Sequence, residues 1–129
     1  FRRWLDVENE EEVGELVAQK ALVRTLSDST DAIEGKADIL RRLVFNYLMQ
    51  AKKGKYPADP VARFHLGNGA LVHQVHTSAD LSDKGRDQSF GAMANYLYDL
   101  RFIERNHENY VTEGNIEYAD KLKPLLYKS

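Results

Sequence analysis

The residues best suited to chemistry in this chain are His65 and the short turn that follows it, Gly67-Asn68-Gly69. An imidazole titrates near neutral pH, so it can hydrogen-bond a carboxylate and supply a proton to a reacting atom. Glycine and asparagine accept the positive φ angles that tight turns require. The sequence therefore predicts an imidazole held beside a tight turn.

Two blocks of residues, in a fixed order, connect this histidine to a known family. The first runs Phe64-His65-Leu66-Gly67-Asn68-Gly69-Ala70, and the second runs Gln88-Ser89-Phe90-Gly91-Ala92-Met93-Ala94-Asn95-Tyr96-Leu97-Tyr98. Ala79-Asp80-Leu81-Ser82 and Gly85 lie between them. In residues and spacing the chain resembles the catalytic-histidine region of malonyl-CoA decarboxylases. The opening Phe1-Arg2-Arg3-Trp4-Leu5 is similar to the family segment that follows a Ser-Pro-Ile-Pro-Gly run.

The resemblance implies roles for four residues of this chain. His65 matches the family's catalytic histidine, and Tyr98 matches the second tyrosine of its Met-Ala-Asn-Tyr-x-Tyr block, which lines the pocket. Asn68 and Ser89 are expected to contact substrate, although a turn residue and a helix N-cap are the ordinary structural alternatives. Tyr96 is expected on another helix face, in the core.

Decarboxylation of a malonyl thioester sets its own requirements. Loss of CO2 leaves an enolate, so a catalyst must hold the departing carboxylate, stabilise the thioester oxyanion and protonate the new carbanion. The thioester carbonyl is the electron sink, so no organic cofactor is needed. In this resemblance His65 is the general acid and carboxylate-binding group, and a serine upstream of Phe1 orients the carboxylate.

The resemblance also implies that residues 1–129 form the C-terminal part of one catalytic domain. The serine, the glycine-rich loop for the CoA pyrophosphate and a helical N-terminal domain would precede Phe1. The expected partners are malonyl-CoA, the remaining N-terminal part of the enzyme and further copies in a homo-oligomer. Two alternatives stay open: acyl transfer from a CoA or carrier thioester on the same fold, and a non-catalytic interaction fragment.

Composition narrows the function classes only slightly. Eighteen basic and 20 acidic residues give a net charge of -2, so neither nucleic acid nor an anionic membrane is an expected partner. The chain has no cysteine, which excludes disulfides and thiolate zinc sites. His73 and His76 are three apart on an expected strand and face opposite ways, so no metal site is predicted. His107 is expected at the surface, and the cytoplasm is the expected location.

The first half of the chain is predicted to be helical. Val13 to Leu26 carries apolar residues at helical spacing after the acidic stretch Glu8 to Glu12. A polar loop, 27–31, precedes a second helix, which is expected to end in a basic turn at 52–54. Its apolar stripe is Leu40, Leu43, Val44, Tyr47, Leu48 and Ala51.

The second half is predicted to begin with a β-hairpin. Residues 61–66 alternate between two faces and place His65 at the end of a strand, and 70–77 return as its partner. A polar loop over 78–88 would lead to a helix capped by Ser89 and running to about Arg105. Asn106, Asn109 and Gly114 mark breaks before a short helix within 116–127. The expected class is α/β with helices flanking a β-hairpin or small sheet; the resemblance implies an acetyltransferase-like (GNAT-type) fold.

Overall fold

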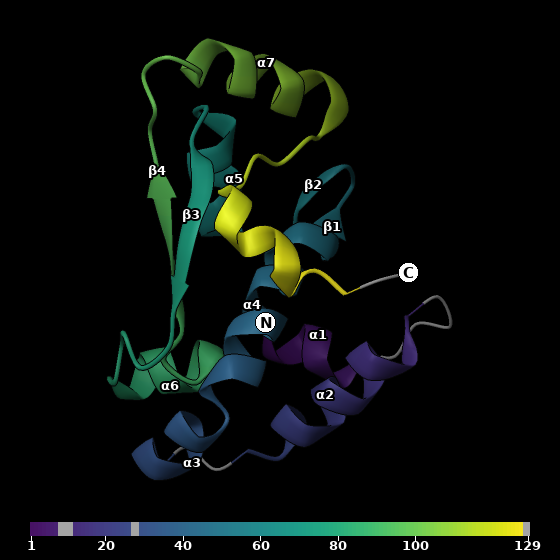
Figure 1. The fold of residues 1–129 in the computed structure, drawn as a ribbon, viewed down its shortest axis with the longest axis vertical. Helices are drawn as coiled ribbons and strands as arrows, with labels where there is room; N and C mark the ends of the chain where they lie inside the picture. The colour runs from purple at the N-terminus through teal and green to yellow at the C-terminus, as the bar shows by residue number, and fades with distance from the viewer. Residues whose placement is uncertain (8–11, 27–28, 128–129) are drawn as a thin grey trace. The chain divides into compact units, whose positions relative to one another are not determined.

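The computed structural model describes residues 1–7, 12–26 and 29–127 (Figure 1). These residues divide into two compact units. The first unit comprises Phe1–Tyr47, Val75–Met93 and Leu125–Ser129, and the second comprises Leu48–Gln74 and Ala94–Pro124. The chain therefore passes between the units within four of its regular elements, which are α4 (Ala37–Gln50), β3 (Leu71–His76), β4 (Met93–Leu97) and the 3₁₀ helix η1 (Asp120–Leu125).

Helices make up the first unit. They are α1 (Arg2–Asp6), α2 (Gly14–Arg24), α3 (Thr30–Gly35), α6 (Asp83–Ser89) and the larger part of α4 (Ala37–Gln50). The helix predicted over 13–26 is confirmed as α2, which buries Leu16, Lys20 and Val23, whereas Leu22 is exposed. Most of the acidic stretch before α2, Glu8 to Glu11, lies outside the described residues.

The helix predicted around Leu40 is confirmed as α4, but its predicted basic end is wrong. Leu40, Leu43, Val44 and Leu48 are buried, as the apolar stripe indicated. Lys52–Lys53 form β1, which pairs antiparallel with β2 (Tyr56–Pro57). Gly54, with φ +69°, makes the turn between these strands, so the lysines enter a hairpin instead of extending the helix.

The strand predicted over 61–66 is instead helix α5 (Pro60–Gly67). Asp59 caps it, because its Oδ2 accepts a hydrogen bond from the Ala62 N–H at 2.9 Å, and Pro60 has the φ that a first helical residue needs. Ala62 and Leu66 are buried four residues apart, which fits a helix. A period of two also places these positions on one face, so alternation alone could not exclude a helix.

Strand β3 (Leu71–His76) confirms the strand predicted over 70–77, but its partner differs. It pairs with β4 (Met93–Leu97), inside the region predicted to be a helix from Ser89 to Arg105. The predicted polar loop contains α6, whose N-cap is Ser82, and Phe90 ends that helix at φ 54°. The residues expected to form one helix, 89–105, are thus the end of α6, the strand β4 and the first residues of a later helix, Ile103–Glu113.

Helix α7 (Ile103–Glu113) follows β4 and contains two of the predicted breaks, Asn106 and Asn109; only Gly114 ends it. The predicted short last helix is confirmed in part as the 3₁₀ helix η1 (Asp120–Leu125), with Pro124 near its end. The fold is a small α/β arrangement of helices and two small antiparallel sheets. No helix of the described residues is long and apolar enough to span a membrane.

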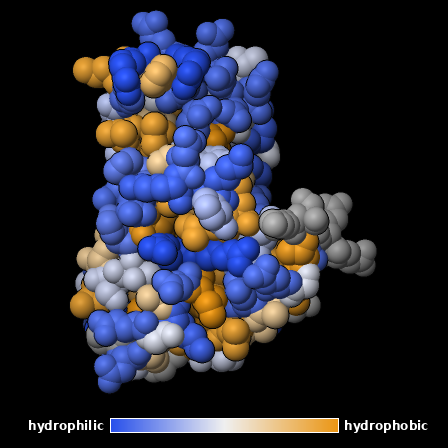
Figure 2. Space-filling view, in the orientation of Figure 1, coloured by the Kyte–Doolittle hydropathy of each residue, from blue (hydrophilic) through white to orange (hydrophobic). Residues whose placement is uncertain are grey.

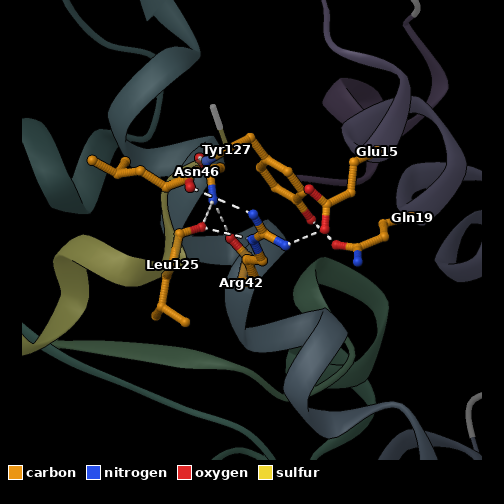
Figure 3. A network of polar contacts seen from close by, with 7 residues as sticks. Glu15, Gln19, Arg42, Asn46, Leu125 and Tyr127 are labelled. Carbon is orange, nitrogen blue, oxygen red and sulfur yellow. Dashed lines mark hydrogen bonds and ion pairs between the residues drawn. The ribbon is translucent and has the colours of Figure 1, made fainter. Parts of the chain in front are cut away.

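A polar network fastens residues 125–127 to α2 and α4 within the first unit (Figure 3). Arg42 donates to the Leu125 carbonyl at 2.9 Å and to Glu15 at 2.8 Å, and its guanidinium lies 3.8 Å from the centre of the Tyr127 ring. Asn46 donates to the same Leu125 carbonyl at 2.9 Å. The Tyr127 hydroxyl donates to Gln19, so the ring is held at both its face and its tip.

Burial raises the pKa of the Tyr127 hydroxyl to about 12, from an ordinary 10.0. Below about pH 10 both the folded and the unfolded chain keep this proton, so the contribution to stability is complete. Between about pH 10 and 12 the unfolded chain loses the proton first, and stability falls as pH rises. We expect the free energy of unfolding, measured with denaturant across this range, to fall more in the wild type than in Tyr127→Phe, by on the order of 2 kcal/mol. All other groups titrate in both proteins, so parallel curves would contradict the assignment.

Candidate active site

His65 and Tyr98 meet in the second unit. His65 stands in the last turn of α5, and Tyr98 directly follows β4. The His65 Nδ1 atom lies 2.7 Å from the Tyr98 hydroxyl oxygen. This is a hydrogen bond in either direction: the hydroxyl donates to a bare Nδ1, or a protonated Nδ1 donates to the hydroxyl oxygen. The structure thus brings together the two residues that the sequence singled out for chemistry, although it places His65 on a helix.

Aromatic rings surround the imidazole on several sides. Tyr96 stacks on it, with ring centres 4.6 Å apart and planes 19° apart. Tyr98 meets it edge-on at 5.8 Å and Phe64 at 5.1 Å. The prediction that Tyr96 lies on a different face from Tyr98 is wrong, because this segment is extended and residues two apart share a side. Sequence reasoning therefore missed Tyr96, although a period of two would have found it.

Apolar side chains close to this pair in sequence are exposed. Phe64 is 65% exposed and Tyr98 40%, and Leu97 and Leu100 on either side of Tyr98 are exposed as well. Figure 2 shows hydrophobic residues interspersed with hydrophilic ones on the face that it presents. A polar pair with aromatic rings against the imidazole and exposed apolar residues next in sequence suits an organic ligand with a polar reacting end.

The turn after His65 is fixed by its own hydrogen bonds. The His65 carbonyl accepts from the N–H groups of Asn68 and Ala70, both at 3.1 Å. Asn68 donates from Nδ2 to the Phe64 carbonyl at 2.9 Å. Its φ is -92°, so it does not use the left-handed conformation expected of it; Gly69, at φ +91°, does. Asn68 is thus committed to ending α5, and its substrate contact stays a prediction.

Gly69 also permits a close approach of α7. A Cβ atom at this position would lie 2.4 Å from the Ile103 carbonyl oxygen, well inside van der Waals contact. His107 is exposed, as predicted, but its Nδ1 lies 2.7 Å from the Gly67 carbonyl oxygen. The end of α5 is therefore bound by the next helix as well as by its own turn.

Ser89 lies in the first unit, apart in sequence from the residues around His65. Its predicted role as a helix N-cap is wrong, because it is the last residue of α6. Its hydroxyl donates to the Ala92 carbonyl at 2.7 Å, which stabilises the turn from α6 into β4. A contact between Ser89 and substrate stays a prediction.

The charges that follow Tyr98 largely satisfy one another. Arg101 donates to Asp99 from Nε at 3.1 Å and from a terminal nitrogen at 2.8 Å. These bonds, together with one from the Arg101 N–H, hold the pKa of the Asp99 carboxyl below its usual range. Asp99 is therefore an anion at neutral pH and offers no proton. Among residues 1–7, 12–26 and 29–127, no three potential ligands from His, Cys, Asp and Glu gather as a metal site would require.

Comparison with known proteins identifies the family. A family model of the malonyl-CoA decarboxylase C-terminal domain matches residues 1–129. The chain belongs to the malonyl-CoA decarboxylase family, as the two blocks around His65 and Tyr98 predicted.

Individual relatives agree with this family. The mitochondrial malonyl-CoA decarboxylase of Mus musculus is 37% identical over 97 residues, which cover 75% of this chain and 19% of that protein. The mitochondrial malonyl-CoA decarboxylase of Rattus norvegicus is 38% identical over 87 residues, 67% of this chain and 18% of that protein. The chain thus spans about a fifth of the length of these relatives.

Solved structures show the same likeness. The crystal structure of malonyl-CoA decarboxylase from Rhodopseudomonas palustris superposes with a TM-score of 0.78 at 34% identity, covering 96% of this chain and 32% of that one. The crystal structure of malonyl-CoA decarboxylase from Agrobacterium vitis superposes with a TM-score of 0.75 at 31% identity, covering 99% of this chain and 33% of that one. This chain therefore corresponds to about a third of those structures.

Two glycines with positive φ offer a matched test of how closely α7 packs on the turn. A Cβ at Gly54 would have nothing within 4 Å, whereas at Gly69 it would strike the Ile103 carbonyl. We expect Gly54→Ala to lower the free energy of unfolding by about 1–2 kcal/mol, the cost of a left-handed non-glycine residue. Gly69→Ala should lower it by about 2–5 kcal/mol, because overpacking adds to that cost. Urea denaturation measures both, and equal losses would show that the close packing contributes nothing.

Proposed function

We propose that the protein of which this chain is part decarboxylates malonyl-CoA to acetyl-CoA and CO2, with His65 as the general acid. The observation that carries the proposal is the 2.7 Å contact between His65 Nδ1 and the Tyr98 hydroxyl, in a member of this family. We further propose that the catalytic domain as a whole has the acetyltransferase-like (GNAT-type) fold, of which the described helices and small sheets would be a part.

The proposed reaction fits the bonding capacity of the pair. An imidazolium has two N–H groups, and Tyr98 oxygen can accept the one on Nδ1 while the one on Nε2 binds the malonyl carboxylate. As the carbon–carbon bond breaks, its electron pair moves into the thioester enolate and CO2 leaves. The Nε2 proton then passes to the α-carbon, which yields acetyl-CoA and a neutral imidazole. Nδ1 keeps its own proton and continues to donate to the Tyr98 oxygen, so the contact survives the proton transfer.

Tyr96 supports the same proposal through its stacked ring. The face of an aromatic ring carries partial negative charge, which interacts favourably with a positive charge lying over it. At a ring separation of 4.6 Å, Tyr96 both fixes the plane of the imidazole and lies where it can stabilise the imidazolium. We therefore include Tyr96, beside Tyr98, among the residues that contact the catalytic group.

The rest of the proposal rests on the family resemblance. A serine from the segment before Phe1 would orient the carboxylate, and a glycine-rich loop there would bind the CoA pyrophosphate. Asn68 and Ser89 are proposed substrate contacts, no organic cofactor takes part, and the enzyme assembles as a homo-oligomer. The cytoplasmic location stays a prediction. Since this chain spans about a third of the related structures, the test requires the full-length protein.

His65→Asn in the full-length protein tests the function directly. Asparagine keeps a nitrogen near the position of Nδ1, so the contact with Tyr98 can persist while the proton on Nε2 is lost. We expect kcat for CO2 release from malonyl-CoA to fall by roughly 10²- to 10⁴-fold, with little change in stability. His73→Asn, on β3, is the matched control and should retain activity. Near-normal turnover by His65→Asn would remove His65 from the mechanism, and acyl transfer without CO2 release would favour the acyltransferase alternative.

Tyr98→Phe separates the hydroxyl from the ring. It keeps the edge-on contact and removes only the hydrogen bond to Nδ1, so we expect a loss of about tenfold or more in kcat, or about 1.4 kcal/mol in the barrier. Tyr96→Phe keeps its stacked ring and should be nearly neutral. Equal kinetics for wild type, Tyr98→Phe and Tyr96→Phe, at saturating and limiting substrate, would return Tyr98 to a packing role.

A further inference from the structure

Helix α7 begins close behind Tyr98 in the chain. Only Asp99 to Phe102 separate them, and these residues are ordered by a turn in which the Phe102 N–H donates to the Asp99 carbonyl at 2.9 Å. A segment this short, closed by its own hydrogen bond, leaves Tyr98 little freedom relative to α7. The position of α7 therefore helps to set the position of the Tyr98 hydroxyl.

The same helix holds the end of α5, two and four residues beyond His65. His107 Nδ1 lies 2.7 Å from the Gly67 carbonyl oxygen, and Asn106 Nδ2 lies 3.2 Å from the Gly69 carbonyl oxygen. A carbonyl oxygen only accepts, so the Nδ1 of His107 carries a proton and donates. A neutral ring with its proton on Nδ1 and an imidazolium both meet this requirement, so the contact survives protonation of His107.

Of the two residues of α7 that bind these carbonyls, Asn106 is the buried one. It is only 3% exposed, and its Oδ1 atom is buried without a hydrogen-bond partner among the residues that the structure describes. A buried amide that leaves its oxygen unsatisfied is costly, and the bond from its nitrogen to the Gly69 carbonyl offsets part of that cost. Its use here is explained by the bond that it makes to the turn after His65.

We propose that Asn106 and His107 are positioning residues for His65: by binding the Gly69 and Gly67 carbonyls from the helix that follows Tyr98, they set the separation of the imidazole and the phenol. Both side chains act on His65 through the backbone carbonyls that follow it in the chain. Because one helix holds both sides of the pair, loosening it on the α5 side should move His65 away from Tyr98. The effect on rate rests on the proposed decarboxylation, but the effect on geometry does not.

The test uses His107, which is exposed and can be replaced without opening the core. In the full-length protein, His107→Leu removes the donor and His107→Asn keeps a donor near the position of Nδ1. Glu108→Ala, an exposed neighbour on α7, is the control. Two quantities are measured at one pH: kcat and KM for malonyl-CoA, and the rate at which diethyl pyrocarbonate modifies His65, located by mass spectrometry and divided by the rate at His73.

We expect His107→Leu to lower kcat roughly tenfold with KM within about twofold, because misplacing a catalytic group affects the chemical step more than binding. His65 should also be modified faster, since it loses its contact with Tyr98. His107→Asn should restore both values. The proposal is overturned if His107→Leu matches the wild type in both measurements, if His107→Asn is as impaired as His107→Leu, or if Glu108→Ala shows the same losses. Faster modification of His65 in a protein that releases no CO2 would instead refute the proposed function and leave the positioning role standing.

Discussion

The close packing of the first turn of α7 on the backbone of Gly69 is the constraint on which the second unit depends. A single Cβ at Gly69 would come within 2.4 Å of the Ile103 carbonyl, so only glycine permits this approach. The approach brings the Gly67 and Gly69 carbonyls within reach of His107 and Asn106. Because α5 ends at this turn, the position of His65 follows from the same contact. The absence of a side chain at Gly69 thus allows the packing of α7 that positions His65.

The first unit is held together by cations that lie in or near its core. Lys20 is 1% exposed and is satisfied by Glu12 at 2.5 Å, by the Val7 carbonyl at 3.0 Å and by the face of Trp4 at 4.1 Å. Arg42 meets carbonyls, a carboxylate and an aromatic face in the same way. Removing a charge from water is costly unless its donors are bound. The contacts of Lys20 and Arg42 therefore specify how the segments that they join lie against one another, more closely than apolar burial alone would.

Local patterns predicted the structure correctly where the spacing of apolar residues fitted a helix and not a strand. They misled where the same spacing fitted both. The stripe from Leu40 to Leu48 has helical spacing only, and α4 formed as predicted. Ala62 and Leu66 share a face in a strand and in a helix alike, and the deciding signal was the cap at Asp59 followed by Pro60. Phe90, Met93 and Leu97 have helical spacing, yet Phe90 adopts a left-handed conformation and the segment becomes β4, because pairing with β3 outweighs local preference.

The sequence by itself determined the family, the helices α2 and α4, the strand β3 and the two residues that meet at the candidate site, His65 and Tyr98. These follow from residue identities and local spacing, which the chain carries without its fold. The helical setting of His65 follows from the local signal of the Asp59 cap and Pro60, which the alternation of residues 61–66 obscured. Tertiary structure decided the stacking of Tyr96 on His65 and the hydrogen bonds from Asn106 and His107 to the end of α5 and its turn. Each of these joins α5 to elements about 30 to 40 residues away in the sequence, and no local period encodes contacts at that separation.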